Sequence, residues 1–372
     1  MNKRKYEALK KLNPQKIVVV LPRFFGDAVM AAPVFKQIRM LYPKAHITAM
    51  GGKPETVGSY ERVFEGHSDV DDLYFYPNYK GKSLIEKFKI LSEMRRKLSS
   101  YELGVIMRNE RSPMLSLVFG GVKNRLAYKE SVDRRWFANL FITHPIPNPK
   151  MRQHLHDVEK NQILLASLGV THFNEVPTLF VTADEETSAL KRLEGKGYIK
   201  GSKLLVISPK AAPYDKAKNW DLNRFIELVK RFIEEDKTVF ILFVGSDHYR
   251  NTIEEAIRGL SPRVISFMGG TTVRELMGLV KISRGVITVD TGIMHLAAAL
   301  RVPLVAIFGA SSDVETGPYG WGRVVKQRVA CSPCLLHLCP IDHRCMTGVS
   351  VDMVYRAFQE ELGKQKADAW IK

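Results

Sequence analysis

Short runs of β-branched and aliphatic residues alternate with longer helical patterns along almost the whole chain. These runs lack the strict polar alternation of a half-exposed strand, which is typical of parallel strands covered by helices on both faces. The alternation therefore predicts a doubly wound α/β fold, in which ligands bind outside the carboxyl ends of the strands. The strands predicted for the first half are 16–21, 46–50, 72–75 and 103–107, with helices at 27–41 and 83–98.

The alternation of strand and helix patterns is interrupted once and then resumes, which predicts two domains in this chain of 372 residues. Three prolines lie within five positions at 145–149. Because proline lacks a backbone donor, we place the interdomain connection at 144–150, followed by a helix over 151–168. Thr272 and Glu275 have the spacing of a capping box and should open a helix. The strands predicted for the second half are 203–208, 237–244, 264–267, 285–289 and 304–308.

These breaks lead us to expect an N-terminal domain over 1–170, a second domain over 171–350, and a C-terminal segment over 351–372. The last segment is predicted to be helical from 351 to about 362, and we expect it to pack back on the N-terminal domain.

The chain is strongly basic, with 56 Lys and Arg against 39 Asp and Glu and a formal net charge of +17. Such an excess favours an acidic partner, which could be a nucleic acid, a phosphorylated sugar or an anionic membrane surface. The alternative is a solvated surface that serves solubility. No apolar run approaches the roughly 18 residues of a membrane span, and the run at 17–22 is too short for a signal-peptide core. We therefore expect a protein that is not exported.

A glycine and a carboxylate follow the first predicted strand. Gly26 permits a tight turn, and Asp27 then opens the next helix. One interpretation is structural, because aspartate is favoured as a helix N-cap. The other is chemical: a carboxylate at the carboxyl end of a strand could accept the proton of a sugar hydroxyl that attacks an anomeric carbon.

A turn suited to phosphate lies between the strand at 285–289 and the helix that follows it. Thr291 and Gly292 can present backbone N–H groups at the helix start, where phosphates bind well. His295 follows four residues after Thr291 on the same helical face. The structural alternative is a turn capped by Asp290, with His295 buried in the core.

A basic stretch follows the strand at 203–208. It runs from Lys210 to Lys218 and on to Asn219 and Trp220. A lysine in this position could meet a phosphate as a point charge. The alternative is a solvated basic loop.

All the cysteines lie in one segment, as Cys331, Cys334, Cys339 and Cys345. Four thiolates so close in sequence could close a tetrahedral site for a structural zinc or iron, although the spacing is not that of a zinc finger. The alternatives are packed reduced thiols, or two disulfides formed on oxidation. Two prolines in the segment favour a loop, so we expect a structural role and no thiolate catalysis.

Three stretches in order along the chain resemble a single known family. The first is Pro22 to Met30 with its Gly-Asp pair, the second is Asp290 to Ala299, and the third is Gly309 with Thr316 to Pro318 and Cys331 to Met346. Together they resemble glycosyltransferase family 9, the ADP-heptose:lipopolysaccharide heptosyltransferases. The first turn and the cysteine segment are more similar to the second heptosyltransferase of the core than to the first.

The resemblance implies the GT-B architecture, in which two Rossmann-like doubly wound domains face each other across a cleft. It also implies an inverting, metal-independent transfer that needs no cofactor, with an ADP-sugar as donor substrate. The acceptor would lie on the N-terminal domain and the nucleotide-sugar donor on the second domain. The implied roles are Asp27 as general base, Lys218 at the phosphates, and Asp290, Thr291, Gly292 and His295 around the ADP.

The implied acceptor is a phosphorylated, lipid-linked sugar of the lipopolysaccharide inner core. Guanidinium groups suit such an anion, so Arg108, Arg111 and Arg125, near the first-domain strand at 103–107, are candidate acceptor ligands, with ordinary surface arginines as the alternative. We expect a cytoplasmic protein associated peripherally with the anionic inner membrane. The rival functions are transfer from another nucleotide sugar to a different surface glycan, and non-catalytic nucleic-acid binding. No nucleic-acid-binding motif supports the second.

Overall fold

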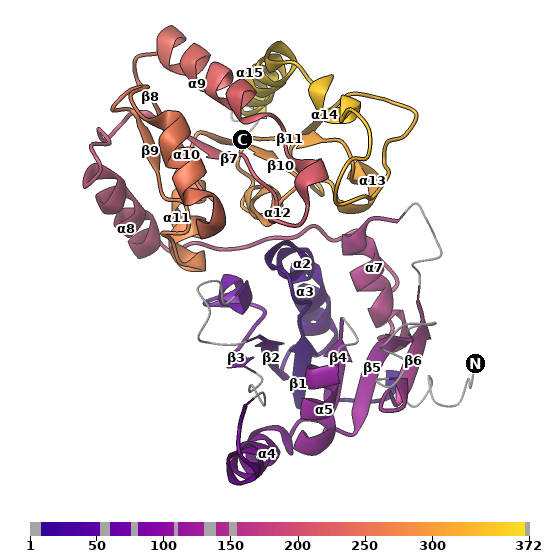
Figure 1. Ribbon diagram of the computed structural model, residues 1–372. Helices are drawn as coiled ribbons and strands as arrows, with labels where there is room; N and C mark the ends of the chain where they lie inside the picture. The colour runs from indigo at the N-terminus through magenta and orange to yellow at the C-terminus, as the bar shows by residue number, and fades with distance from the viewer. Residues whose placement is uncertain are drawn as a thin grey trace. The chain divides into compact units, whose positions relative to one another are not determined.

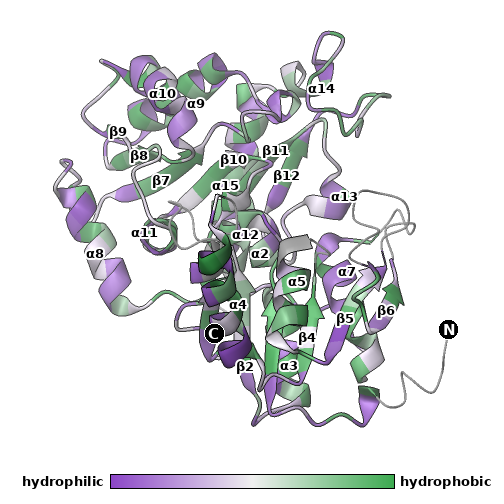
Figure 2. Cartoon of the chain, turned by 60° about the horizontal axis from the view of Figure 1, so that its bottom comes forward, coloured by the Kyte–Doolittle hydropathy of each residue, from purple (hydrophilic) through white to green (hydrophobic). Residues whose placement is uncertain are grey.

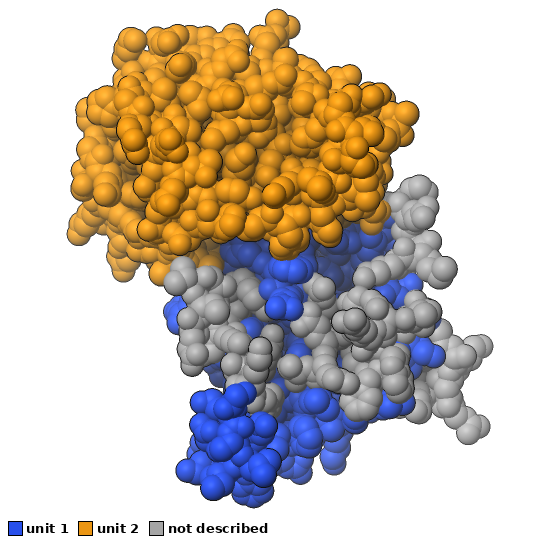
Figure 3. Space-filling view, in the orientation of Figure 1, with its two compact units in different colours: residues 1–179 blue, residues 180–372 orange. Residues whose placement is uncertain are grey.

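The computed structural model of the chain describes residues 9–52, 60–75, 81–107, 111–129, 139–148 and 155–368 (Figure 1). It divides the chain into two compact units, residues 1–179 and 180–372 (Figure 3). Each unit contains a parallel sheet of six strands with helices around it. The central strands of both sheets are hydrophobic, as Figure 2 shows by colour.

In the first unit the strand order is β3-β2-β1-β4-β5-β6. All neighbours are parallel, and β1 pairs with β2 on one side and β4 on the other, so the strand order reverses beside β1. The three strands β1, β2 and β4 match predicted strands to within one residue at their ends, and β3 matches at both ends. The strands are β1 (Lys16–Val20), β2 (His46–Gly51), β3 (Asp72–Phe75), β4 (Leu103–Ile106), β5 (Asn124–Lys129) and β6 (His144–Pro147).

The prolines at 145 and 147 lie within a strand, so the prediction of an interdomain connection at 144–150 is wrong. Strand β6 is the edge of its sheet and pairs only with β5, with Pro145 opposite Ala127 and Pro147 opposite Lys129. An edge strand tolerates proline because its missing donor is not needed by a second neighbour.

The boundary between the units falls after Leu179, whereas the sequence placed it after 170. The segment 171–179 is bound to the first unit by side chains of that unit, which contact the backbone of the segment. Gln162 donates from Nε2 to the carbonyl of Glu175 at 2.8 Å and accepts from the Glu175 N–H at 3.0 Å. The ring of His67 lies 3.1 Å from the carbonyl of Thr178. These bonds keep the segment with the first unit.

The helical pattern at 27–41 forms two helices rather than one, because Pro33 has no N–H to bond the carbonyl of Val29. The break lies at Ala31, which ends one helix and caps the next. The predicted helix at 83–98 is present and starts with a capping box between Ser83 and Glu86. The helices of this unit are α2 (Phe25–Met30), α3 (Ala32–Leu41), α4 (Leu84–Leu98), α5 (Arg111–Gly120) and α7 (Asp157–Ile163), with 3₁₀ turns at Tyr60–Phe64 and Leu164–Leu168.

In the second unit the strand order is β12-β11-β10-β7-β8-β9. Counted within the unit, this is the order 3-2-1-4-5-6 that the first sheet also has, and it is the order of a Rossmann fold. The prediction of two Rossmann-like doubly wound domains is therefore confirmed. The strands are β7 (Lys203–Ser208), β8 (Val239–Phe243), β9 (Val264–Ser266), β10 (Gly285–Val289), β11 (Leu304–Phe308) and β12 (Arg323–Lys326).

Helices surround this second sheet. The capping box predicted at Thr272 and Glu275 is present at the start of α11. Among the described helices, none combines the length and apolar character needed to span a bilayer. The helices are α8 (Ala183–Glu194), α9 (Leu222–Glu235), α10 (Arg250–Ile257), α11 (Val273–Lys281), α12 (Gly292–Ala299), α13 (Asp313–Thr316), α14 (Arg344–Thr347) and α15 (Val351–Asp368), with 3₁₀ turns at Lys216–Lys218 and Asp247–Tyr249.

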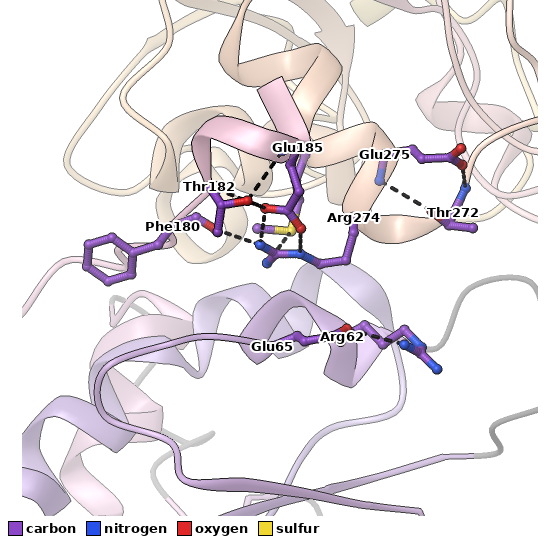
Figure 4. A network of polar contacts seen from close by, with 9 residues as sticks. Arg62, Glu65, Phe180, Thr182, Glu185, Thr272, Arg274 and Glu275 are labelled. Carbon is purple, nitrogen blue, oxygen red and sulfur yellow. Dashed lines mark hydrogen bonds and ion pairs between the residues drawn. The ribbon is translucent and has the colours of Figure 1, made fainter. Parts of the chain in front are cut away.

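Helices α8 and α11 are joined by a bidentate ion pair between Arg274 and Glu185 (Figure 4). Arg274 donates from Nε and Nη2 to the two carboxylate oxygens of Glu185, at 2.6 and 2.5 Å. Gly278 permits the close approach, because a Cβ at this position would lie 2.9 Å from the carbonyl of Glu185. The α8–α11 pair is thus fixed by two ion pairs, Glu185–Arg274 and Arg192–Glu275, and by one small residue.

The last helix, α15, packs on the second sheet, and its expected contact with the N-terminal domain stays a prediction. Phe358 is fully buried, and its ring lies 5.5 Å from that of Phe232 on α9. A Cβ at Gly285 in β10 would lie 2.5 Å from the Phe358 ring, so only glycine admits this ring over the strand. Val354 and Ala357 join the same buried cluster, so the apolar face of α15 is used within the second unit.

Candidate active site

The carboxyl ends of β7 and β10 lie next to each other, because these two strands pair where the strand order reverses. The loop after β7 carries Lys218, and the turn after β10 carries Asp290. Lys218 Nζ lies 3.0 Å from Asp290 Oδ2, an ion pair whose angle is poor for a hydrogen bond. The structure thus brings together two candidate residues that come from separate motifs.

A second carboxylate shares this lysine. Asp215 Oδ2 lies 3.5 Å from Lys218 Nζ, and Asp290 and Asp215 are both buried. Burial acts to lower the pKa of Lys218, but the charges of Asp290 and Asp215 outweigh it and raise the pKa above its ordinary value. Lys218 therefore carries a permanent positive charge at neutral pH. By contrast, burial lowers the pKa of Lys210 on the same loop.

The start of α12 lies directly beside this ion pair in the chain. Thr291 is the N-cap residue, with extended backbone, and within the described chain its side chain makes no cap hydrogen bond. Its hydroxyl instead lies 3.1 Å from that of Thr288. The first amide groups of a helix have no intrahelical acceptor, so those after Thr291 are suited to an anion. The alternative in which Asp290 caps this helix does not hold, whereas His295 is buried, as that alternative expected.

A pocket of about 190 Å³ opens at the same end of the second sheet. Lys218 and Asp215 form one wall, and the residues after β11 form another. The hydroxyl of Ser311 is buried there, and it has no hydrogen-bond partner among the described residues. The lining residues are Asp215, Lys218, Ala310, Ser311, Ser312, Glu315, Thr316, Leu335, Leu336 and His337.

Sequence reasoning singled out Lys218 in this pocket but missed Asp215, Ser311, Glu315 and His337. Ser311 follows the predicted strand at 304–308 after Gly309 and Ala310, so its place near the carboxyl edge was a usable signal. His337 gave no such signal, because it reaches the pocket through a loop. Its Nδ1 is hydrogen-bonded to Asp215 Oδ1, a contact between residues far apart in sequence.

The cysteine segment forms part of this wall, and its cysteines do not have the arrangement of a metal site in the described chain. All four cysteines are described and are free thiols, and no described group of His, Cys, Asp or Glu has the arrangement of a metal site. Cys331 is exposed while Cys345 is buried. Burial is the main cause that raises the pKa of Cys345, and the charges of the other three cysteines raise it further. The raised pKa keeps Cys345 a neutral thiol. The four residues therefore do not fit the tetrathiolate site that the sequence predicted.

Backbone hydrogen bonds hold the segment instead. The Leu335 N–H donates to the Ala310 carbonyl at 2.8 Å, and the Ala217 N–H donates to the His337 carbonyl at 2.9 Å. The ring of His343 lies 2.7 Å from the carbonyl of Ala217. Two of these contacts attach the segment to the loop that carries Lys218, and the Leu335 contact attaches it to the end of β11.

Asp27 is the third residue of α2, which follows β1 at the centre of the first sheet. The N-cap of that helix is Phe24, which gives no side-chain cap, so Asp27 is not the cap that the structural alternative required. Its neighbours Gly26 and Ala28 are buried, whereas Asp27 is partly exposed. The carboxylate thus lies at the carboxyl edge of its own sheet, where ligands of such folds bind.

The three candidate acceptor arginines have different outcomes. Arg108 lies outside the described residues, and Arg111 begins α5, with a side chain that is not described. Arg125 is the second residue of β5, at the amino edge of the sheet and so opposite Asp27. Its guanidinium is held by backbone carbonyls, including those of Phe141 at 2.6 Å and Val122. The expectation that Arg125 faces the acceptor is therefore wrong.

A doubly wound α/β fold with a cation beside a helix start, at a reversal of strand order, is typical of proteins that bind nucleotides. Residues 94–344 match the family model described as glycosyltransferase family 9 (heptosyltransferase). The chain belongs to this family and is a glycosyltransferase.

Several proteins are similar to it over nearly their whole length. Lipooligosaccharide heptosyltransferase 2 of Campylobacter jejuni is 23% identical over 345 residues, covering 91% of this chain and 96% of that protein. The solved structure of a family 9 glycosyltransferase from Veillonella parvula has a TM-score of 0.77 at 18% identity, covering 94% of this chain and 97% of the other. E. coli ADP-heptose LPS heptosyltransferase II has a TM-score of 0.76 at 20% identity, covering 94% and 99%. The two structures share the fold.

Proposed function

We propose that this protein transfers a heptose from ADP-heptose to a phosphorylated, lipid-linked sugar of the lipopolysaccharide inner core. The observation that carries the proposal is the Lys218–Asp290 pair beside the uncapped start of α12. A permanent cation and the amide groups in the first turn of α12 suit a nucleoside diphosphate. The name of the similar E. coli protein, ADP-heptose LPS heptosyltransferase II, supports this donor and this acceptor.

The proposed reaction is a single displacement. The acceptor hydroxyl oxygen bonds to the anomeric carbon while the bond from that carbon to the diphosphate oxygen breaks, and the configuration inverts. Asp27 accepts the hydroxyl proton. The electron pair of the broken bond stays on the diphosphate, whose charge Lys218 and the α12 amide groups stabilise. These groups supply the charge stabilisation, so the proposed mechanism needs no metal ion.

In this proposal the second unit holds the donor and the first unit holds the acceptor. Thr291 and Gly292 contact the diphosphate through their amide groups, and Asp290 keeps Lys218 in position. His295 is buried on the same helix and supports the turn. We further propose that the protein works at the cytoplasmic face of the inner membrane, where a lipid-linked acceptor would be reached.

Calorimetric titration with ADP, UDP and GDP tests the donor site. We expect ADP to bind best, and Lys218→Met to raise its Kd about tenfold or more, a loss of about 1.4 kcal/mol. The matched control is Lys216→Met, which removes an exposed lysine from the same 3₁₀ turn.

Equal losses in the two variants would mean that net charge, not the site, sets the affinity. Preferred binding of UDP or GDP would point to a different nucleotide sugar and a different glycan. An assay of heptose transfer from ADP-heptose to core lipopolysaccharide lacking that heptose then tests the whole reaction.

A further inference from the structure

Helix α4 carries two separate apolar stripes. One stripe, with Met94 and Leu98, is buried against α5. The contact is close, since a Cβ at Gly120 of α5 would lie 2.6 Å from Leu98 Cβ. This stripe accounts for the packing of α4 on its own unit.

The other stripe does not pack on the described chain. Leu84 is 83% exposed, Ile85 is 72% exposed and Phe88 is 74% exposed. At about 100° of rotation per residue, these three lie on one face, roughly a quarter turn from the buried stripe. Figure 2 shows hydrophobic and hydrophilic residues side by side on α4. An exposed Leu, Ile and Phe together on two turns of a helix mark an interaction surface.

Basic side chains share this face. Lys89 and Arg96 lie within about the same half of the helix as the exposed stripe, whereas the guanidinium of Arg95 packs against Gly121 after α5. The two acidic residues of α4 lie on the other side, where each has a basic partner: Glu86 is 3.3 Å from Lys82, and Glu93 is 3.4 Å from Lys97. The exposed apolar face of α4, a helix described throughout its length, is therefore flanked by positive charge alone.

We infer that this face, made of Leu84, Ile85, Phe88, Lys89 and Arg96, docks the protein on an anionic lipid bilayer. Apolar side chains that lie beside lysine and arginine are the composition of a helix that rests in the membrane interface. The apolar groups enter the boundary of the acyl chains, and each basic group near the surface adds about 1 kcal/mol of attraction to anionic headgroups. The excess of 56 basic over 39 acidic residues in the chain acts in the same direction.

A bilayer fits this face better than a protein partner does. A protein–protein interface core is depleted of charge and is enclosed by a polar rim of both signs. Here two cations, Lys89 and Arg96, lie among three apolar residues of α4 with no acid between them, and a second copy of the same face would repel it. This assigns the membrane contact of the proposed function to one helix. Its test uses neither substrate, so its outcome is separate from that of the transfer assay.

Co-sedimentation of the full chain with vesicles tests the inference. We expect binding to vesicles of phosphatidylcholine with about one third phosphatidylglycerol, and little binding to phosphatidylcholine alone. The triple variant Leu84→Ser, Ile85→Ser, Phe88→Ser should reduce binding about tenfold or more. It should still fold, because all three side chains are exposed. The matched control is Met40→Ser on α3, which removes a side chain that is 67% exposed from the same unit.

The charge contribution is tested by Lys89→Gln with Arg96→Gln. This double variant should weaken binding to the anionic vesicles, and added salt should do the same to the unchanged protein. The matched control is Lys230→Gln with Lys237→Gln, which removes the same charge from exposed positions of the second unit.

Three results would overturn the inference: no binding of the unchanged protein to anionic vesicles, full binding by the triple variant, or equal losses in the two double variants. Analytical ultracentrifugation without lipid adds a fourth. If the unchanged protein dimerises and the triple variant does not, the face is an interface between copies.

Discussion

The positive charge of Lys218 is set by its neighbours, and this explains how a half-buried lysine stays charged. Asp290 and Asp215 approach it from the turn after β10 and from its own loop. The sequence predicted the motifs that carry Lys218 and Asp290 but not their contact. It contains no signal that the two loops meet, because that depends on β7 pairing with β10 across the reversal of strand order.

Asp27 is the residue on which the proposed chemistry depends. We expect Asp27→Asn to fold and to lose transfer by a factor on the order of 10² or more, because the amide cannot accept the hydroxyl proton. Loss of a first-turn charge should cost only about 0.3–1 kcal/mol of stability. The measurement is kcat for heptose transfer, with a thermal melt for folding.

Asp184→Asn is the matched control for Asp27, since it removes an exposed carboxylate from the first turn of α8. Turnover by Asp27→Asn within a few-fold of that control would remove Asp27 from the mechanism.

At the scale of elements, local sequence pattern identified the apolar strands well and missed three strands of mixed composition. Strands β7, β10 and β11 match their predicted ranges at both ends, because fully buried apolar runs are unambiguous. Strands β5, β6 and β12 were missed. They contain Arg125, two prolines and Arg323, and their exposed positions dilute the apolar pattern. These three strands are held by pairing with a neighbouring strand, and local sequence does not reveal that pairing.

The Glu185–Arg274 pair should make the α8–α11 contact sensitive to acid. Burial acts to raise the pKa of Glu185, but hydrogen bonds from Arg274 and Thr182 outweigh it and lower the pKa below its ordinary 4.5. A lowered folded-state pKa means that the pair stabilises fully above pH 4.5 and loses its effect as the pH falls through the folded-state value.

We therefore expect Glu185→Gln to lower the free energy of unfolding by about 2 kcal/mol at pH 7, because it leaves the Arg274 charge without its carboxylate. The difference from the unchanged protein should shrink as the pH falls below 4.5, which urea unfolding at several pH values can measure. Glu186→Gln, on the same turn, is the control and should show neither effect. A difference that stays constant down to pH 3 would contradict the pKa direction.

At the scale of the whole molecule, each unit has its own sheet and its own buried core. Phe358 belongs to the core of the second unit, where it covers Gly285. We expect Phe358→Ala to lower the stability of that unit by about 3–5 kcal/mol, since the ring would leave a cavity. Differential scanning calorimetry should show the transition of the second unit at a lower temperature and that of the first unit unchanged.

Phe88→Ala supplies the control, as the same change at a ring that is 74% exposed, and it should leave both transitions in place. An equal shift of all transitions in Phe358→Ala would show that the units unfold as one.

The hydrogen bonds that attach the cysteine segment to the Lys218 loop have a consequence for biosynthesis. All six strands of the first sheet are encoded by residue 147, so that sheet can form while translation continues. The second unit cannot form so early, because its contacts involve residues near the end of the chain. Strand β7 pairs with β10, His337 lines the pocket, and Phe358 packs over Gly285 of β10. A ribosome stalled after β11 would therefore hold a finished first sheet and an open second one. A frameshift before Phe358 would therefore disturb the packing of β10, the strand that Asp290 follows.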